Sequence, residues 1–508
     1  MQKGFGKSRS LSPIIYANSR KTPRLPAVCC RSVAPAQLSL IHILEGITLV
    51  HLISASATLI LMIGLGIYSG RKVSGAADFD TGGGRAGAIM VAGTIIGTLV
   101  GGSSTIGTAE LAFNFGFSAW WFTLGAAIGC LILAVFFVVP LRNCGCATIQ
   151  QLIQKHFSPT AGLITSVLAT LGLGLNIVSQ LLSANVLLSS MFGLNTLTCT
   201  AISVVTMACY VIFGGVNSTG LLGIVKSVLL YIAVLVCGGA ALVLSGGIGS
   251  IQAVLPHDQY FNLFARGVGK DLGAGVSVIL GVISTQTYVQ ALLAGRDSAS
   301  SRRGALLSAL LIPPIGVGGI LIGYYMRISF PAMAAGEAFP RFVIQNIPPV
   351  LSGVVLATLF IAVVGTGAGL ALGLSTVITN NIYKRFAKHT DSRSSLRFSR
   401  AVILITLLIA AVFTTGNLKS AILTWGFLSM GLRAVVLLGP MCAALFFPSQ
   451  ADRRFVTASS IVGIVILLAA KFLALPGDCL FWGMGGSILI IALGCLVPTS
   501  QYKSIDKS

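Results

Sequence analysis

Apolar residues gather in long runs that recur along most of this chain. A run of about 20 apolar residues can cross the hydrocarbon core of a bilayer as a helix. The runs predict thirteen membrane spans, near 47–69, 86–110, 117–139, 160–186, 197–215, 221–245, 272–293, 304–327, 350–383, 399–416, 420–446, 455–474 and 478–497. The run at 350–383 exceeds one straight crossing, so we expect it to tilt or to extend into the cytoplasm.

Two of these runs are interrupted by small and polar residues. The stretch Gly97–Glu110 reads GTLVGGSSTIGTAE, and the seventh span opens at Asp271–Gly275 and contains Ser284–Thr287. The two runs lie five spans apart and therefore enter the membrane from opposite sides. Paired interruptions in inverted halves indicate the binding site of a transporter.

Composition supports a membrane protein of the all-α polytopic class. Of the 508 residues, 55% are hydrophobic and 9% are charged, whereas a soluble chain has about 25% charged residues. The net charge of +21 arises mostly from loops. Eighteen Lys and Arg residues fall on one set of loops and five on the other, which predicts a cytoplasmic C-terminus, an external N-terminus and no role in binding nucleic acid.

The runs also divide the chain into regions. We expect a disordered tail or a misassigned start at 1–45, with a targeting segment as the alternative, and a peripheral helix and loop at 46–85. The transport core should be 86–446, in halves 86–245 and 272–446, followed by two peripheral helices and a short tail at 447–508.

The glycines of the first interruption allow two interpretations. They permit neighbouring helices to pack closely, or they permit the helix to unwind. Unwinding frees backbone carbonyls, which together with hydroxyls such as those of Ser103, Ser104, Thr105 and Thr108 suit a hard cation like Na⁺. A second small-and-hydroxyl stretch, Ala362–Lys384, contains Thr366 at membrane depth.

Several other polar residues also lie within predicted spans. Lys226 lies one turn inside its span, where its side chain either extends to the cytoplasmic face or turns inward. Arg433 is near the centre of its span, so we expect it to pair with carbonyls or to line water. The amide side chains within spans, such as Gln180, either line a cavity or link neighbouring helices.

Four motifs resemble the sodium:solute symporter family. They are the loop Gly66–Arg85, the segment Gly101–Gly107 (GGSSTIG), the charged loop Gly295–Leu307, and Phe339–Gly369 followed by Ser375–Lys384. The resemblance runs from about Gly66 to Phe446 and implies a core of five plus five helices in inverted repeats, with broken first and sixth core helices.

The resemblance also implies the site residues. Carried over by position, the cation site falls on Gly97, Val100, Ala362, Gly365 and Thr366. The substrate site falls on Ser103, Ser104, Thr105, Ser284, Thr285 and Gln286. The sequence departs from the family at Gly365, which lacks the expected hydroxyl, and at Lys226, which is the only ionisable group where the family usually has an acid.

We therefore expect a secondary active transporter in the cell membrane, coupled to Na⁺, for a small polar solute such as an amino acid or a carboxylate. The alternative is a proton-coupled or sodium-independent exchanger in which Lys226 replaces the sodium ion. A sensor module and a channel are remote alternatives. With five His and twelve acidic residues in the chain, we expect no catalytic residues and no organic cofactor.

Overall fold

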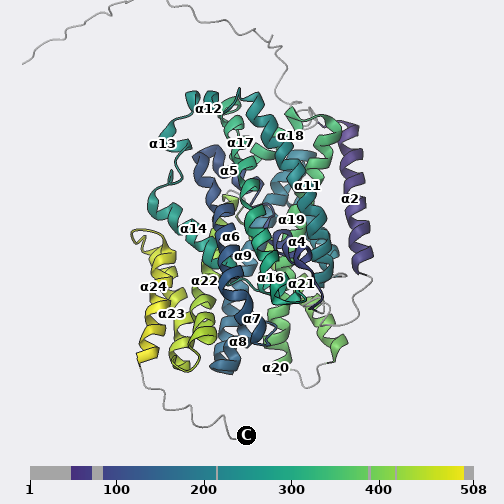
Figure 1. Ribbon diagram of the computed structural model, residues 1–508. Helices are drawn as coiled ribbons and strands as arrows, with labels where there is room; N and C mark the ends of the chain where they lie inside the picture. Colours follow the sequence, from purple (N-terminus) through teal and green to yellow (C-terminus); the bar gives the residue numbers. More distant parts are fainter. Residues whose placement is uncertain (1–46, 71–83, 213–214, 387–390, 418–419, 497–508) are drawn as a thin grey trace, which may run out of the picture. The chain divides into compact units, whose positions relative to one another are not determined.

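The computed structural model describes residues 47–70, 84–212, 215–386, 391–417 and 420–496. The predicted N-terminal tail lies outside the described residues. Throughout these ranges the chain folds into helices, and each of the thirteen expected spans coincides with a helix or with consecutive helices (Figure 1).

The described residues begin with the peripheral helix α2 and continue with the helices and short helical turns of the first half of the core. Their bounds are α2 (Leu49–Gly70), α4 (Ala88–Leu99), α5 (Ile106–Phe115), η2 (Gly116–Trp120), α6 (Trp121–Ile132), η3 (Leu133–Phe137), α7 (Val138–Asn143), α8 (Ile149–His156), α9 (Pro159–Phe192), α10 (Thr196–Ile212) and α11 (Gly215–Leu244).

The second half repeats this succession after two short connecting helices, and two peripheral helices follow it. The connecting helices are α12 (Ile248–Val254) and α13 (His257–Tyr260). The elements of the second half are α14 (Val268–Ile283), α15 (Gln286–Ala294), α16 (Ser298–Leu311), α17 (Pro313–Ser329), η4 (Ala335–Glu337), α18 (Ala338–Asn346), α19 (Pro349–Ile378), η5 (Thr379–Tyr383), α20 (Lys384–Phe386), α21 (Ser392–Thr415) and α22 (Ile422–Phe446), and the peripheral helices are α23 (Arg453–Phe472) and α24 (Cys479–Leu496).

Length and hydropathy identify nine membrane-crossing helical segments among the described residues, and the bent pair α14–α15 makes a tenth. Shorter apolar helices occur at Leu49–Leu61, Ala88–Leu99 and Thr196–Val211. The expected long span is a continuous helical segment of 38 residues, Pro349–Phe386, which is longer than one straight crossing requires. Its apolar part is 94% buried, so α19 lies inside the bundle rather than against lipid.

Both predicted interruptions are breaks in the helices. The first core helix stops at Leu99 and resumes at Ile106, with Val100 in an extended conformation. The sixth core helix stops at Ile283 and resumes at Gln286, and its two halves are bent by 42°. The breaks leave backbone groups free of the helical ladder at membrane depth, where they need other partners.

Glycine is required in the first break because other helices approach it closely. A Cβ atom on Gly101 would lie 2.5 Å from Gln180 Oε1 of α9 and 2.6 Å from Thr366 Oγ1 of α19. A Cβ atom on Gly102 would lie 2.2 Å from the side chain of Ser183. The two interpretations of these glycines therefore both hold: the helix is interrupted, and its neighbours pack against the interruption.

The packing of the helices follows the inverted repeat. In the first half α11 packs along the broken helix at α4, and in the second half α22 packs along the broken helix at α14. The helices α9 and α19 pack against each other between the halves. The peripheral helices α23 and α24 pair with each other beside α22, and α2 packs on α19.

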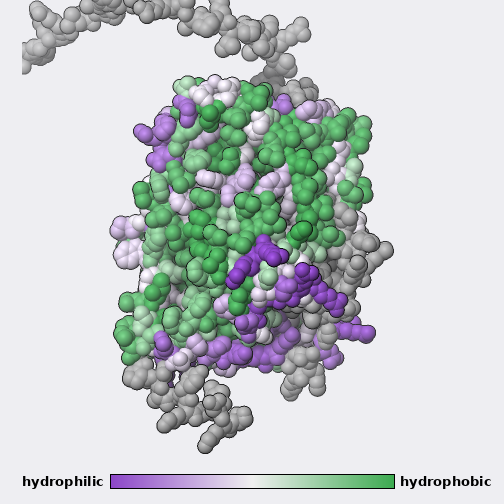
Figure 2. Space-filling model, viewed as in Figure 1, coloured by the Kyte–Doolittle hydropathy of each residue, from purple (hydrophilic) through white to green (hydrophobic). Residues whose placement is uncertain are grey.

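The outer surface is apolar along the flank of the bundle. Large side chains such as those of Leu171, Leu235, Val243 and Ile409 are more than half exposed. Figure 2 shows this hydrophobic flank and a concentration of hydrophilic residues toward the lower end, around α7, α8 and α16 as labelled in Figure 1. This distribution fits a protein whose flank contacts lipid and whose ends contact water.

Gly223 allows α11 to approach α4, and its replacement tests the importance of that contact. A Cβ atom on Gly223 would lie 2.1 Å from the backbone oxygen of Gly93. We expect Gly223→Ala to destabilise the protein by about 1–3 kcal/mol, as overpacking generally does, measured as a lower unfolding temperature in detergent.

The matched control is Gly239→Ala in the same helix, because a Cβ atom on Gly239 would have no neighbour within 4 Å. This change should leave the unfolding temperature unchanged or raise it, since alanine favours helix over glycine. Equal destabilisation by both substitutions would contradict the close approach of α4 and α11.

Candidate functional site

The ammonium of Lys226 lies at the first break. Its Nζ donates hydrogen bonds to the backbone oxygen of Gly97 at 2.7 Å, to the backbone oxygen of Ala362 at 2.9 Å and to Thr366 Oγ1 at 2.9 Å. The side chain is 1% exposed. A lysine ammonium has three hydrogens, and these three oxygens match their number.

Thr366 completes the connection between the break and α19. Its hydroxyl lies 3.1 Å from the backbone oxygen of Val100 and 3.3 Å from that of Gly97, and it accepts from Lys226. The structure therefore brings Gly97, Val100, Ala362 and Thr366 together around one point. These are the oxygen-bearing residues that the family resemblance assigns to a cation, and the atom that contacts three of them is Nζ of Lys226.

The departure at Gly365 has a steric explanation. A Cβ atom on Gly365 would lie 3.1 Å from Tyr210 Oη and 3.6 Å from Lys226 Cδ. The stem of Lys226 thus passes Gly365 on its way to the break. A side chain at 365 would therefore press on the Tyr210 hydroxyl, whereas its contact with the lysine stem would be of ordinary length.

One of the two interpretations of Lys226 is therefore wrong. The side chain does not extend to the membrane surface but turns inward to the break. The three buried acceptors compensate for the loss of water, which is how an intramembrane cation becomes tolerable.

The residues predicted for the substrate site form two groups. Ser103 Oγ lies 2.8 Å from Ser179 Oγ of α9 and accepts a hydrogen bond from Gln180 Nε2 at 3.2 Å. Ser104 and Thr105 donate to backbone oxygens of the break itself, those of Leu99 and Gly101. All three side chains are buried.

The second group lies at the second break. Ser284 Oγ donates to the backbone oxygen of Leu280, and Thr285 Oγ1 donates to that of Gly281. Gln286 is directed elsewhere, because its amide donates to the backbone oxygen of Ala147 and its Oε1 accepts from the backbone amide of Ile149. Gln286 thus fastens the start of α15 to the segment before α8.

Arg433 lies at the same break and is 1% exposed. Its Nη1 donates to Thr285 Oγ1 at 2.7 Å and its Nε to the backbone oxygen of Ser429 at 3.1 Å. Its Nη2 approaches Ser429 Oγ at 3.1 Å and Met430 Sδ at 3.0 Å. The prediction that Arg433 pairs with a carbonyl is confirmed.

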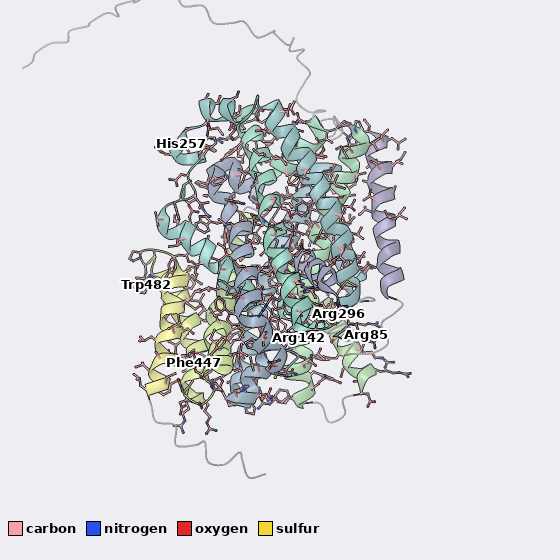
Figure 3. The ribbon with its side chains drawn as sticks, in the orientation of Figure 1. Arg85, Arg142, His257, Arg296, Phe447 and Trp482 are labelled. Atoms are coloured by element: carbon pink, nitrogen blue, oxygen red, sulfur yellow. The ribbon has the colours of Figure 1, made fainter. Side chains whose placement is uncertain are left out.

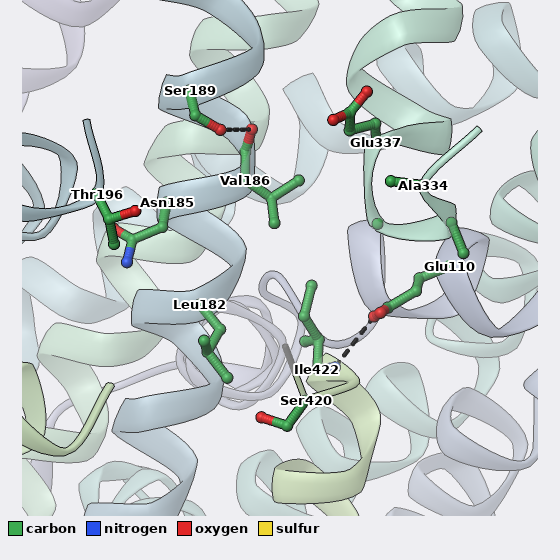
Figure 4. A pocket seen from close by; sticks show the side chains of 12 residues that line it. Glu110, Leu182, Asn185, Val186, Ser189, Thr196, Ala334, Glu337, Ser420 and Ile422 are labelled. Atoms are coloured by element: carbon green, nitrogen blue, oxygen red, sulfur yellow. Dashed lines mark hydrogen bonds between the residues drawn. The ribbon is translucent and has the colours of Figure 1, made fainter. Parts of the chain in front are cut away.

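A cavity of about 460 Å³ lies beside α5, α9 and the start of α22. Its lining includes two carboxylates, Glu110 and Glu337, and the amide of Asn185 (Figure 4). Glu110 Oε2 accepts from the backbone amide of Ile422 at 3.0 Å and so joins α5 to the start of α22. Glu110 therefore connects two helices of the core as well as facing the cavity.

Arg142 fastens the other end of the sixth core helix. Its Nη1 donates to the backbone oxygens of Leu292 and Gly295 at 2.9 and 2.7 Å. Arg142 and Arg296 lie near the same end of the bundle in Figure 3. The amide of Arg296 in turn donates to the backbone oxygen of Ala86, so the start of the first broken helix and the end of the second are joined there.

The side chains that hydrogen-bond to the backbone of the breaks are hard to identify from the sequence. Gln180 Oε1 accepts from the backbone amide of Gly102 at 2.8 Å, which satisfies a donor that the break leaves free. Of the two roles open to Gln180, the linking of helices is the one observed. Neither spacing nor composition could have identified Gly102 as its partner.

Comparisons with known proteins agree with this fold. An uncharacterized symporter, YwcA of Bacillus subtilis (strain 168), is 20% identical over 368 residues, which cover 68% of this chain and 72% of that protein. The solved structure of a Na⁺-coupled sialic acid symporter in a substrate-bound outward-open state matches with a TM-score of 0.77 at 16% identity, covering 88% of this chain and 97% of that one.

Inward-facing Mhp1 matches with a TM-score of 0.54 at 15% identity, over 82% of this chain and 91% of that one. At these identities the two structures establish the fold alone. The family model described as the sodium:solute symporter family matches residues 79–449, which include both breaks, Lys226 and Arg433. The chain belongs to the sodium:solute symporter family.

Proposed function

We propose that this protein is a secondary active transporter of a small polar organic solute, and that the Lys226 ammonium takes the position of a coupling cation. The observation that carries the proposal is the set of three hydrogen bonds from Lys226 Nζ to Gly97, Ala362 and Thr366. A sodium ion bound by the same oxygens would occupy the space of the ammonium, so one excludes the other.

The protonation state of Lys226 then controls the first break. The ammonium draws together the break after α4 and the middle of α19. Loss of one proton leaves two hydrogens for three acceptors and removes the charge, which weakens the connection between the two helices. A lysine ammonium can release its proton when it moves between environments, and this change of charge would favour one conformation of the carrier over the other.

Na⁺ symport is the second candidate, and membership of the sodium:solute symporter family favours it. In that case Lys226 must leave the oxygens of Gly97, Val100, Ala362 and Thr366 before the ion binds. The two candidates differ in which cation those oxygens hold during the cycle, and transport measurements distinguish them.

The solute site is proposed between the two breaks. Ser103, Ser104 and Thr105 belong to the first break and Ser284 and Thr285 to the second, and their hydroxyls are buried at membrane depth. Small hydroxyl-bearing side chains favour a small polar solute. The unequal distribution of Lys and Arg supports a cell-membrane protein with its C-terminus in the cytoplasm.

Uptake into proteoliposomes tests the coupling. We expect a proton gradient, acid outside, to drive solute accumulation at least several-fold above the level without a gradient, because Lys226 is the titratable group at the site. A sodium gradient alone should have little effect. Accumulation driven by sodium at constant pH would favour the second candidate, and uptake indifferent to both gradients would contradict secondary active transport.

Replacement of Lys226 by a neutral residue of similar length tests its role directly. We expect Lys226→Met to reduce gradient-driven uptake about tenfold or more, because the three acceptors lose their donor and the break loses its charge. Lys270→Met is the control, since Lys270 is exposed. Wild-type uptake by Lys226→Met would contradict the proposal, whereas new sodium dependence in this variant would support the replacement of an ion by the ammonium.

A further inference from the structure

Arg433 is a permanent positive charge in the membrane interior with only neutral neighbours. Its hydrogen-bond acceptors are Thr285, Ser429 and the sulfur of Met430, which is a weak acceptor. Among the residues that the structure describes, no carboxylate lies within ion-pair distance of Arg433. A guanidinium does not lose its proton in a protein, so this charge cannot be removed by titration.

Arg433 is also the counterpart of Lys226 in the inverted repeat. Lys226 lies on α11 and bonds to the break between α4 and α5 and to α19. Arg433 lies on α22, bonds to the break between α14 and α15 through Thr285, and packs against α9, where a Cβ atom on Gly172 would lie 2.6 Å from Arg433 Cγ. Each half of the core therefore places one buried cation at the break of its own broken helix.

We propose that Arg433 binds the carboxylate of an anionic solute at the second break, an inference that rests on the proposed transport function. A planar guanidinium matches a carboxylate through two parallel hydrogen bonds. Nη1 and Nη2 provide that pair, with Thr285 and Met430 as the neutral partners that a carboxylate would displace. A bound anion supplies the compensating charge that the protein does not.

The start of α15 adds to the attraction for an anion. This helix of nine residues begins at Gln286, directly after Thr285, so the positive end of its dipole lies at the same break. Arg433 and the helix end thus act on the same region. Their combined effect favours a carboxylate over a neutral amide of the same shape.

Glu110 and Glu337, the acidic residues of the cavity beside α5, do not compete with a solute carboxylate for Arg433. Glu110 is bound by the backbone amide at the N-terminus of α22, and Glu337 lies 3.7 Å from Arg341. Each of these side chains therefore has its own partner away from Arg433. The buried cations at the two breaks have no acidic partner among the described residues.

Ligand-induced thermal stabilisation of the purified protein tests the inference separately from transport. The probes are potassium propionate, lactate and succinate, each paired with its neutral amide. We expect at least one carboxylate to raise the unfolding temperature at concentrations at which its amide does not. Stabilisation by amides and carboxylates alike, or by none of the carboxylates, would overturn the proposal.

Variants of Arg433 then locate the binding group. We expect Arg433→Gln to weaken carboxylate binding at least about tenfold, and Arg433→Lys to retain part of it because the charge remains. Arg303→Gln is the control, since Arg303 is exposed at the start of α16. Wild-type affinity for the carboxylate in a folded Arg433→Gln protein would overturn the proposal.

Transport and binding can fail independently. Carboxylate binding that depends on Arg433, without accumulation in proteoliposomes under any gradient, would support this inference and contradict the proposed function. Gradient-driven accumulation of a neutral amide, unchanged in Arg433→Gln, would support the proposed function and contradict this inference.

Discussion

The hydrogen bonds of one buried ammonium organise the centre of this transporter. Lys226 joins the interrupted first helix of the core to α19, and it satisfies oxygens that the interruption leaves without partners. Several features of the sequence follow from this contact. Gly223 allows α11 close to α4, Gly365 lies beside the lysine stem and Tyr210, and Gly101 lets α9 and α19 reach the break.

Periodicity and composition were sufficient to predict much of the fold. The thirteen spans and the two interruptions follow from the position of apolar runs and small residues, because the bilayer imposes a minimum helix length and penalises free backbone groups. The oxygens of Gly97, Val100, Ala362 and Thr366 came from the family resemblance. The structure brings them together, and their role in transport stays a prediction.

The contacts between helices could not be predicted from the sequence. From its depth in the span, the Lys226 side chain could extend to the cytoplasmic face or turn toward the first break. The hydrogen bond to Thr366 of α19 shows that it turns toward the break. In the sequence alone, Gly365 is a missing hydroxyl in a cation site, and only the structure shows that Tyr210 and the lysine stem lie beside it. Similarly, Gln180 and Arg142 act on backbone atoms far away in sequence, which no local pattern records.

The two buried cations give the inverted repeats unequal chemistry within a shared geometry. In the proposed mechanism the ammonium on α11 releases and regains a proton during the cycle, whereas the guanidinium on α22 keeps its charge throughout. Under that proposal, a change of pH would weaken or strengthen the contacts of one half of the core, while the charge in the other half would stay constant. Two repeats with the same geometry would then differ in function, because only the broken helix that contacts Lys226 would respond to pH.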